Sequence, residues 1–219
     1  KMVFNREELV KSAGTRYSIS PQIMALKDLY SLSLEKLEDM GIYDIEALRL
    51  AFVGTPCQCR AVSKMKYLSI KPAHLIKYVI SLFCFENFNY EQLVKILKDK
   101  TGVAPKDFEK TWIKKNFFLQ DQNGKEHEVN IKKLDPAVRS HCHECEEFTG
   151  KYADISVGSS GAPKGHSMII TRTERGNQVI DDLSARGWID EHVVPVRELH
   201  EWKDKKLNWF KKMISFKNK

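Results

Sequence analysis

Two apolar runs in the first half of the chain predict buried β-strands. One covers residues 48–53 and ends at Gly54-Thr55-Pro56, and the other covers residues 75–83. Apolar runs of this length that stop at turn residues are typical of strands buried inside a sheet. A helical pattern over residues 58–66 lies between them. Because the order is strand, helix, strand, we expect the two strands to be parallel neighbours joined by a right-handed crossover.

The rest of the chain alternates between shorter strands and helices. Residues 111–131 alternate in polarity around Asn123-Gly124, which predicts a β-hairpin. Asn89 is suited to cap a helix that runs to about residue 100. Further helices are expected at 5–11, 174–186 and 197–219, and further strands at 153–157 and 167–172. The predicted fold class is α/β (α+β), with a mixed sheet, flanking helices and a β-hairpin insertion.

Composition and charge narrow the functional classes. Of the 219 residues, 42% are apolar and 30% are charged, as in an ordinary globular protein, and no apolar run is long enough to span a bilayer. No secretory signal opens the chain, so we expect a reducing cytoplasm. The net charge of +7 is uneven, because residues 197–219 carry eight Lys or Arg and three Asp or Glu. The body is therefore close to neutral, which argues against a diffuse nucleic-acid-binding face.

The charge distribution suggests a boundary near the C-terminus. We predict an α/β domain over residues 1–196 and a basic C-terminal helix over residues 197–219. Three roles stay open for this helix, namely packing on its own domain, docking to a partner subunit, and contact with an anionic membrane surface. Its apolar face consists of Leu207, Phe210, Met213 and Ile214.

Four of the five cysteines are the strongest chemical signal in the chain. Cys57 and Cys84 each follow a predicted strand, and Cys142 and Cys145 form a Cys-x-x-Cys pair. The carboxyl ends of parallel neighbours meet at one edge of a sheet, which is where such sheets bind ligands. An odd cysteine count in a chain without an export signal favours metal or redox chemistry over disulfides. The sequence therefore predicts a four-thiolate site for an iron–sulfur cluster or for zinc.

Zinc is the main alternative to the cluster. Structural zinc sites usually take two local cysteine pairs, and here only one pair is local, which favours the cluster. Cys59 is interpreted as a buried packing residue beside the first ligand. His141 and His143 are interpreted as solvent-facing neighbours of the Cys-x-x-Cys pair.

Two glycine-containing loops are candidate anion sites. The loop over residues 12–18 combines Gly14, hydroxyl groups and Arg16 ahead of a helix, a set suited to holding phosphate. The loop over residues 158–165 contains three glycines, which let backbone approach a flat ring or a phosphate. An ordinary connecting loop is the alternative in both cases. An ion pair between Asp154 and Arg172, which flank the second loop, would be structural.

Several of these segments, taken in order, resemble a known family. They are Ala13 to Tyr17, Gly54 to Gln58, Leu82 to Phe88, Cys142 to Cys145 with Phe148-Thr149, and Ala153 to Ser159 through Arg172-Thr173. This order resembles the coenzyme F420 hydrogenase/dehydrogenase beta-subunit family. Its members include the beta subunits of the F420-reducing hydrogenase and the F420-linked formate dehydrogenase, and the input module of the F420H2 dehydrogenase. The resemblance covers roughly residues 8–185.

The resemblance implies an F420-dependent oxidoreductase subunit with FAD and one 4Fe–4S cluster. In this family the flavin exchanges a hydride with coenzyme F420, and electrons pass singly through the cluster to a partner subunit. That partner is the catalytic or electron-accepting subunit of a hydrogenase, a formate dehydrogenase or a similar complex. No catalytic base is assigned. The ligands carried over to this chain are Cys57, Cys84, Cys142 and Cys145 for the cluster, and Ser12, Ala13, Gly14, Thr15, Arg16, Tyr17, Gly158, Ser159 and Gly161 for the cofactor.

The chain departs from the family pattern in two respects. The family's glycine-rich flavin-binding segment would lie upstream of Lys1, so we expect sequence to be missing there and the FAD site to be incomplete in these residues. Cys59 is an additional thiol beside the first ligand. Two alternatives stay open, namely a zinc-stabilised interaction module without redox activity, and an electron-relay subunit of the same family that uses a donor other than F420.

Overall fold

A computed structural model describes residues 2–12, 32 and 34–217 of the chain. The described residues form two compact units. The first combines the described part of residues 1–20 with residues 86–144, and the second combines the described parts of residues 21–85 and 145–219. The division therefore falls inside the predicted 1–196 domain, and the C-terminal helix belongs to the second unit.

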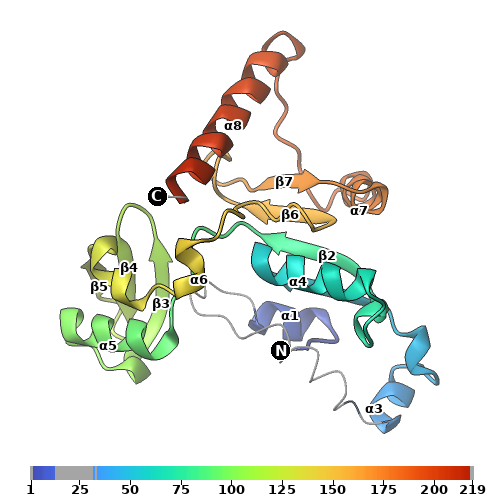
Figure 1. Cartoon of the computed structure of the whole chain (residues 1–219), viewed down its shortest axis with the longest axis horizontal. Helices are drawn as coiled ribbons and strands as arrows, with labels where there is room; N and C mark the ends of the chain where they lie inside the picture. The colour runs from blue at the N-terminus through green and yellow to red at the C-terminus, as the bar shows by residue number, and fades with distance from the viewer. Residues whose placement is uncertain (1, 13–31, 33, 218–219) are drawn as a thin grey trace. The chain divides into compact units, whose positions relative to one another are not determined.

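The second unit contains a four-stranded mixed sheet with flanking helices, as the predicted fold class requires (Figure 1). β1, β2 and β6 are parallel to one another, and β7 is antiparallel to β6. The prediction that the first two strands are parallel neighbours is confirmed. In spatial order the strands are β1 (Leu50–Gly54), β2 (Ile76–Leu82), β6 (Ile155–Gly158) and β7 (Met168–Thr171).

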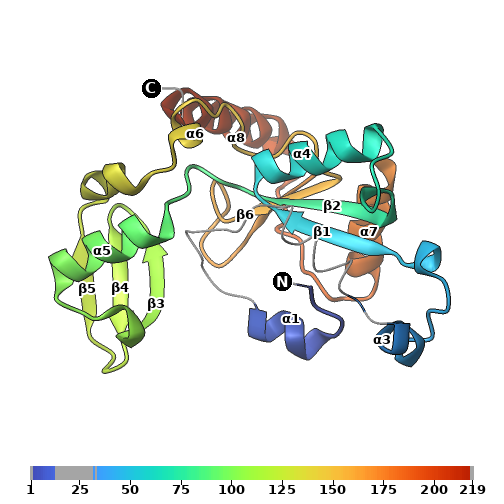
Figure 2. The ribbon, with the colours of Figure 1, turned by 60° about the horizontal axis from the view of Figure 1, so that its bottom comes forward.

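Helix α4 (Pro56–Tyr67) makes the crossover from β1 to β2 and lies along these strands (Figure 2). It begins sharply because Pro56 occupies its first turn and Gln58 Oε1 accepts a hydrogen bond from Thr55 N at 3.1 Å. Cys59 and Val62 of the helix are buried in one apolar cluster with β-sheet side chains. Removal of this apolar surface from water fixes α4 on the sheet.

The other described helices of the second unit precede β1, lie between α4 and β2, or follow β7. They are α3 (Leu34–Asp39), η1 (Ile45–Ala47), η2 (Ala73–Leu75), α7 (Glu174–Ala185) and α8 (Val196–Lys217). In α8, Phe210 packs edge-on against the ring of Phe83 at a centroid distance of 5.7 Å, and Trp209 lies 6.3 Å from Phe148. The basic helix therefore packs on its own unit, and the other two roles stay predictions.

Membrane insertion has no support among the described helices, since none of them combines the length and the apolar character that crossing a bilayer needs. The cytoplasmic location stays a prediction.

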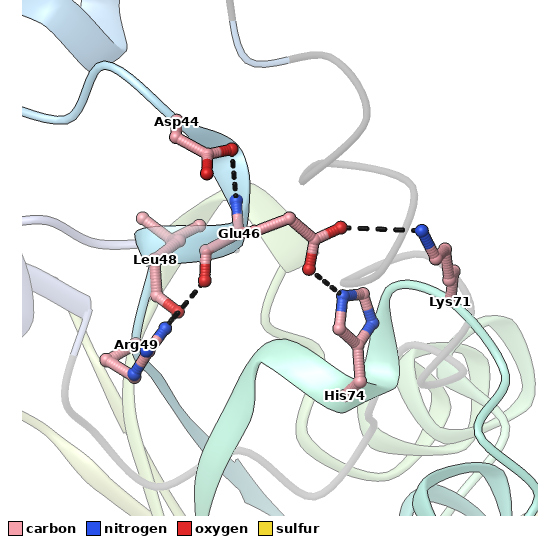
Figure 3. Close-up of polar contacts among 6 residues, drawn as sticks. All are labelled: Asp44, Glu46, Leu48, Arg49, Lys71 and His74. Atoms are coloured by element: carbon pink, nitrogen blue, oxygen red, sulfur yellow. Dashed lines mark hydrogen bonds and ion pairs between the residues drawn. The ribbon is translucent and has the colours of Figure 1, made fainter.

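A small polar cluster holds the segments that lead into β1 and β2 (Figure 3). The Glu46 carboxylate contacts His74 Nε2 at 2.7 Å and Lys71 Nζ at 3.4 Å. Arg49 donates to the backbone carbonyls of Glu46 and Leu48 at 2.8 and 2.9 Å. Because η1 precedes β1 and η2 precedes β2, these contacts tie the amino ends of the two strands together.

The first unit has its own sheet and its own core. Helix α5 begins at its cap Asn89, whose side chain accepts from Gln92 N, as predicted. The strands form an antiparallel sheet in the order β3-β4-β5, and the predicted turn at Asn123-Gly124 lies between β4 and β5. Buried side chains such as Leu97 and Phe117 form a separate apolar cluster. The elements are α1 (Arg6–Ser12), α5 (Tyr90–Thr101), η3 (Pro105–Asp107), β3 (Phe108–Ile113), β4 (Phe117–Asp121), β5 (Glu126–Val129), η4 (Ile131–Ala137) and α6 (Ser140–His143).

Candidate functional site at the carboxyl edge of the sheet

The carboxyl ends of β1, β2 and β6 form one edge of the sheet, called the carboxyl edge below. In the parallel register Gly54 pairs with Ser81, and Cys57 and Cys84 each follow three residues later. β6 ends beside them, since its Val157 O accepts from Phe83 N at 2.9 Å, and the 158–165 loop begins there. Both cysteines therefore follow the same sheet edge, as predicted.

Cys57 lies exposed at the N-terminus of a helix. It lies in the first turn of α4, and its Sγ lies 3.3 Å from Thr55 Oγ1. Cys57 thus has the solvent access that a metal ligand needs.

Cys59, two residues along the same helix, has the opposite surroundings. Its side chain is fully buried, and its Sγ lies 3.6 Å from Gly54 O and 3.5 Å from Ile80 O. Burial raises the pKa of the Cys59 thiol to about 11, because the low dielectric disfavours the charged sulfur. The interpretation of Cys59 as a packing residue is confirmed.

Cys84 and Cys145 are both partly buried at the carboxyl edge. Cys84 N donates to Phe148 O at 3.1 Å, which ties the segment after β2 to the segment that follows the Cys-x-x-Cys pair. Cys145 Sγ lies 3.7 Å from Glu147 O, at the outer limit of a weak thiol hydrogen bond. The two segments that carry these thiols are therefore held together through backbone contacts.

Lys217 is a buried residue of this edge that the sequence interpretation missed. Its Nζ donates to Cys84 O at 2.9 Å and also to Glu147 O. The ammonium group thus clamps the backbone on both sides of the cysteine segments. One sequence signal points to it, because Lys217 follows Phe210 by seven residues and so lies on the same face of α8.

Cys142 belongs to the first unit, where it lies in α6. Its Sγ lies 3.7 Å from Asn87 O, and its N donates to Arg139 O at 2.8 Å. The boundary at 144/145 falls between the two members of the Cys-x-x-Cys pair, so the structure describes their thiols separately. His141 and His143 are exposed, as predicted.

The chemistry of the donor set fits an iron–sulfur cluster or zinc. All five cysteines carry thiols rather than disulfides, and thiolate is the ligand that both metals take in four-sulfur sites. Within the described residues, no three His, Cys, Asp or Glu side chains gather closely enough to hold a metal ion. Ligation by all four cysteines stays a prediction.

Of the two loops predicted to bind the cofactor, the structure describes the 158–165 loop in full and only the first residue of the 12–17 loop. Ser12 is the last residue of α1, and Ala13, Gly14, Thr15, Arg16 and Tyr17 lie outside the described residues.

The 158–165 loop is closely approached by aromatic rings of this chain. A Cβ atom at Gly158 would lie 2.3 Å from the Phe83 ring, and one at Gly161, whose φ is +83°, would lie 3.3 Å from Trp209. Lys206 Nζ also donates to Gly161 O. Phe83 and α8 of this chain therefore account for the glycines at both positions, without reference to a bound ring.

Asp154 and Arg172, which flank the 158–165 loop, bond to other partners and not to each other's side chains. Asp154 instead pairs with Arg175 Nε at 2.9 Å. Arg172 donates to Ser156 Oγ at 2.6 Å and to Thr149 Oγ1 at 3.0 Å. The reason is that Arg172 follows β7 directly and its side chain reaches back to β6, whereas Arg175 lies in the first turn of α7 beside the Asp154 carboxylate.

Comparison with known proteins gives a consistent family match. The family model for the C terminus of the beta subunit of coenzyme F420 hydrogenase/dehydrogenase matches residues 47–195. The chain is 33% identical to a Coenzyme F420 hydrogenase subunit beta of Methanococcus voltae, over 87% of this chain and 64% of that protein. It is 32% identical to a Coenzyme F420-dependent sulfite reductase of Methanocaldococcus jannaschii, over 97% of this chain and 33% of that protein. The chain thus spans from one third to nearly two thirds of these relatives.

A solved structure has the same fold. The chain superposes on a chain of the F420-reducing [NiFe] hydrogenase complex from Methanosarcina barkeri with a TM-score of 0.71 and 29% sequence identity. The match covers 96% of this chain and 71% of that chain.

Proposed function

Because this chain belongs to the coenzyme F420 hydrogenase/dehydrogenase beta-subunit family, we propose that it is an iron–sulfur flavoprotein subunit of an F420-linked oxidoreductase. The observation that carries the proposal is the register of β1 and β2. Cys57 and Cys84 each follow the paired residues Gly54 and Ser81 by three positions, in a chain whose other two motif cysteines form a Cys-x-x-Cys pair.

The residues proposed to hold a 4Fe–4S cluster are Cys57, Cys84, Cys142 and Cys145. Cys57 presents its sulfur from the exposed first turn of α4, and Lys217 fixes the backbone next to Cys84. Cys59 takes no part, since its side chain is fully buried in the apolar cluster between α4 and the sheet. When bound, an FAD would exchange a hydride with coenzyme F420 and the cluster would take electrons one at a time.

The aromatic rings beside Cys84 give the proposed cluster site an apolar surrounding. Phe83, Phe148 and Phe210 lie within 5.5 to 6.3 Å of one another by ring centroids. Such packing excludes water and lowers the local dielectric, which is one way in which a protein sets the potential of a cluster. We propose the 12–17 and 158–161 loops as the part of the flavin site that this chain contributes.

The partner proposed for this chain is the catalytic or electron-accepting subunit of a hydrogenase, a formate dehydrogenase or a related complex. The relatives whose names mention hydrogenase, sulfite reductase and formate dehydrogenase support this range.

The test is anaerobic reconstitution of the chain with iron and sulfide, followed by metal and sulfide analysis and a visible spectrum. We expect four irons and four sulfides per chain, and a broad cluster absorption. Substitution of Cys84 by Ser should remove this absorption, whereas the matched control Cys59→Ala should retain it, because Cys59 lies in the core.

Three outcomes would count against the proposal. Stoichiometric zinc without sulfide would favour the interaction-module alternative. Equal loss of iron in Cys59→Ala and Cys84→Ser would show that the ligand set is wrong. A flavin-loaded protein that does not oxidise reduced F420 with an artificial acceptor would favour the relay subunit with another donor.

A further inference from the structure

A positively charged cavity lies near the amino end of β6, away from the cysteines. Its volume is about 280 Å³, and the second unit supplies all of its walls. Because β6 is parallel to β2, this end of the strand is opposite to the carboxyl edge. The charged side chains in the wall are Lys66, Lys151, Arg172, Arg175 and Asp154.

The single carboxylate of this cavity is fully engaged. Asp154 Oδ2 accepts from Val79 N at 2.8 Å. Its Oδ1 accepts from Thr173 Oγ1 at 2.8 Å and pairs with Arg175 Nε at 2.9 Å. The cavity wall therefore contains one carboxylate and four cationic side chains. Both oxygens of the carboxylate already accept hydrogen bonds, from Arg175 and from two neutral donors.

Lys66 differs from the other cationic side chains of the cavity in its contacts. Lys151 pairs with Glu147 at 3.3 Å, and Arg172 is bonded to Ser156 and Thr149. Within the described part of the chain, the Lys66 side chain has no hydrogen bond or ion pair. Burial and the charge of Arg175 lower the pKa of Lys66, against a smaller opposing effect of Asp154.

The wall also includes the beginning of a helix. Thr173 caps α7, a helix of 12 residues, and Thr173 and Arg175 both line the cavity. The N-terminus of a helix adds partial positive charge and N–H donors that suit an oxyanion. A cavity of about 280 Å³ leaves room for a phosphate group and part of an attached ester.

We propose that this cavity binds the phosphate group of a small phosphate-bearing molecule, with Lys66 as its charged donor. The charge excess fits a dianion better than a carboxylate, because a dianion neutralises more of the crowded positive charge. The site rests on the cavity and its charges, and it stands independently of the proposed redox function.

The experiment is isothermal titration of the full chain with inorganic phosphate and, in a separate series, with AMP. The protein is purified in phosphate-free buffer, and chloride holds the ionic strength constant. Three proteins are compared, namely the unsubstituted chain, Lys66→Met, and the matched control Lys64→Met, which removes an exposed lysine from the same helix. Thermal unfolding in phosphate-free buffer verifies that both variants fold.

We expect Lys66→Met to weaken binding about tenfold, the effect of one charge-assisted hydrogen bond, and Lys64→Met to leave it within about twofold. Dependence on Lys66 with inorganic phosphate alone identifies the free ion as ligand, and dependence with AMP identifies a phosphate ester. Equal affinities of all three proteins would show diffuse charge attraction and would overturn the proposal. Absence of binding by the unsubstituted chain to both probes would also overturn it.

Discussion

The two ends of the parallel strands in the second unit are built from different chemistry. At the amino ends, charged groups meet partners of opposite charge, as Glu46 meets Lys71 and Asp154 meets Arg175. At the carboxyl ends, thiols lie beside glycine and aromatic rings, and the cation Lys217 bonds to backbone carbonyls. The contacts of the thiols are weak, such as the 3.7 Å between Cys145 Sγ and Glu147 O. The comparison indicates that ionic stabilisation of the sheet is concentrated at one end, whereas the groups suited to reaction are at the other.

The largest expected effect is on the amino side, at Asp154. The Asp154→Ala variant should lose about 3 kcal/mol of unfolding free energy, because it leaves Val79 N and Arg175 without their acceptor. Cys57→Ala on the carboxyl side should change it by less than about 0.5 kcal/mol, because Cys57 is exposed. Urea denaturation of both variants measures the difference. Equal losses would break the comparison.

An intermediate effect is expected at Lys217, the buried cation of the carboxyl side. Its replacement by Met should cost about 2 kcal/mol, because the carbonyls of Cys84 and Glu147 would lose a charged donor. Lys211→Met, an exposed position of the same helix, serves as control and should be nearly neutral. Denaturation curves that are identical for the two variants would show that the clamp does not stabilise the fold.

The smallest effect is expected at Glu46 and concerns pH. The hydrogen bond from His74 lowers the pKa of Glu46 from its ordinary value of 4.5. A carboxyl whose pKa is lower in the folded state stabilises the fold above its unfolded pKa, and this contribution is lost as the pH falls through the lowered value. Unfolding free energy should therefore fall more steeply below pH 4.5 in the unsubstituted chain than in Glu46→Gln. Parallel curves would contradict this, and His74→Gln provides the reciprocal control.

Much of the second unit was predictable because its signals are local. The apolar runs before Gly54 and Phe83 identify two strands, and the intervening helix requires them to be parallel. The shared edge of Cys57 and Cys84 follows from that order alone. The sequence also separated Cys59 from Cys57, because the other cysteines account for the site. The structure adds the physical reason, since Cys57 lies in the first turn of α4 and Cys59 points into the core.

The rest depends on contacts between distant positions. Lys217 reaches carbonyls 133 and 70 residues earlier in the chain, and no local pattern encodes such a partner. The choice of Arg175 over Arg172 by Asp154 depends on where β7 ends and α7 begins. The division into two units was missed because residues 86–144 carry their own core around Phe117, which an unbroken pattern of short elements does not reveal.

The burial of Cys59 determines how fast a thiol reagent can modify it. Its sulfur is sealed inside the β1, α4 and β2 layer, so a thiol reagent reaches it only when that layer opens. In the chain without a bound metal, the rate at which Cys59 is modified therefore measures how often this layer opens, whereas the exposed Cys57 needs no opening to react. One helix thus holds a buried thiol whose reaction rate reports core opening and an exposed thiol that serves as its internal control.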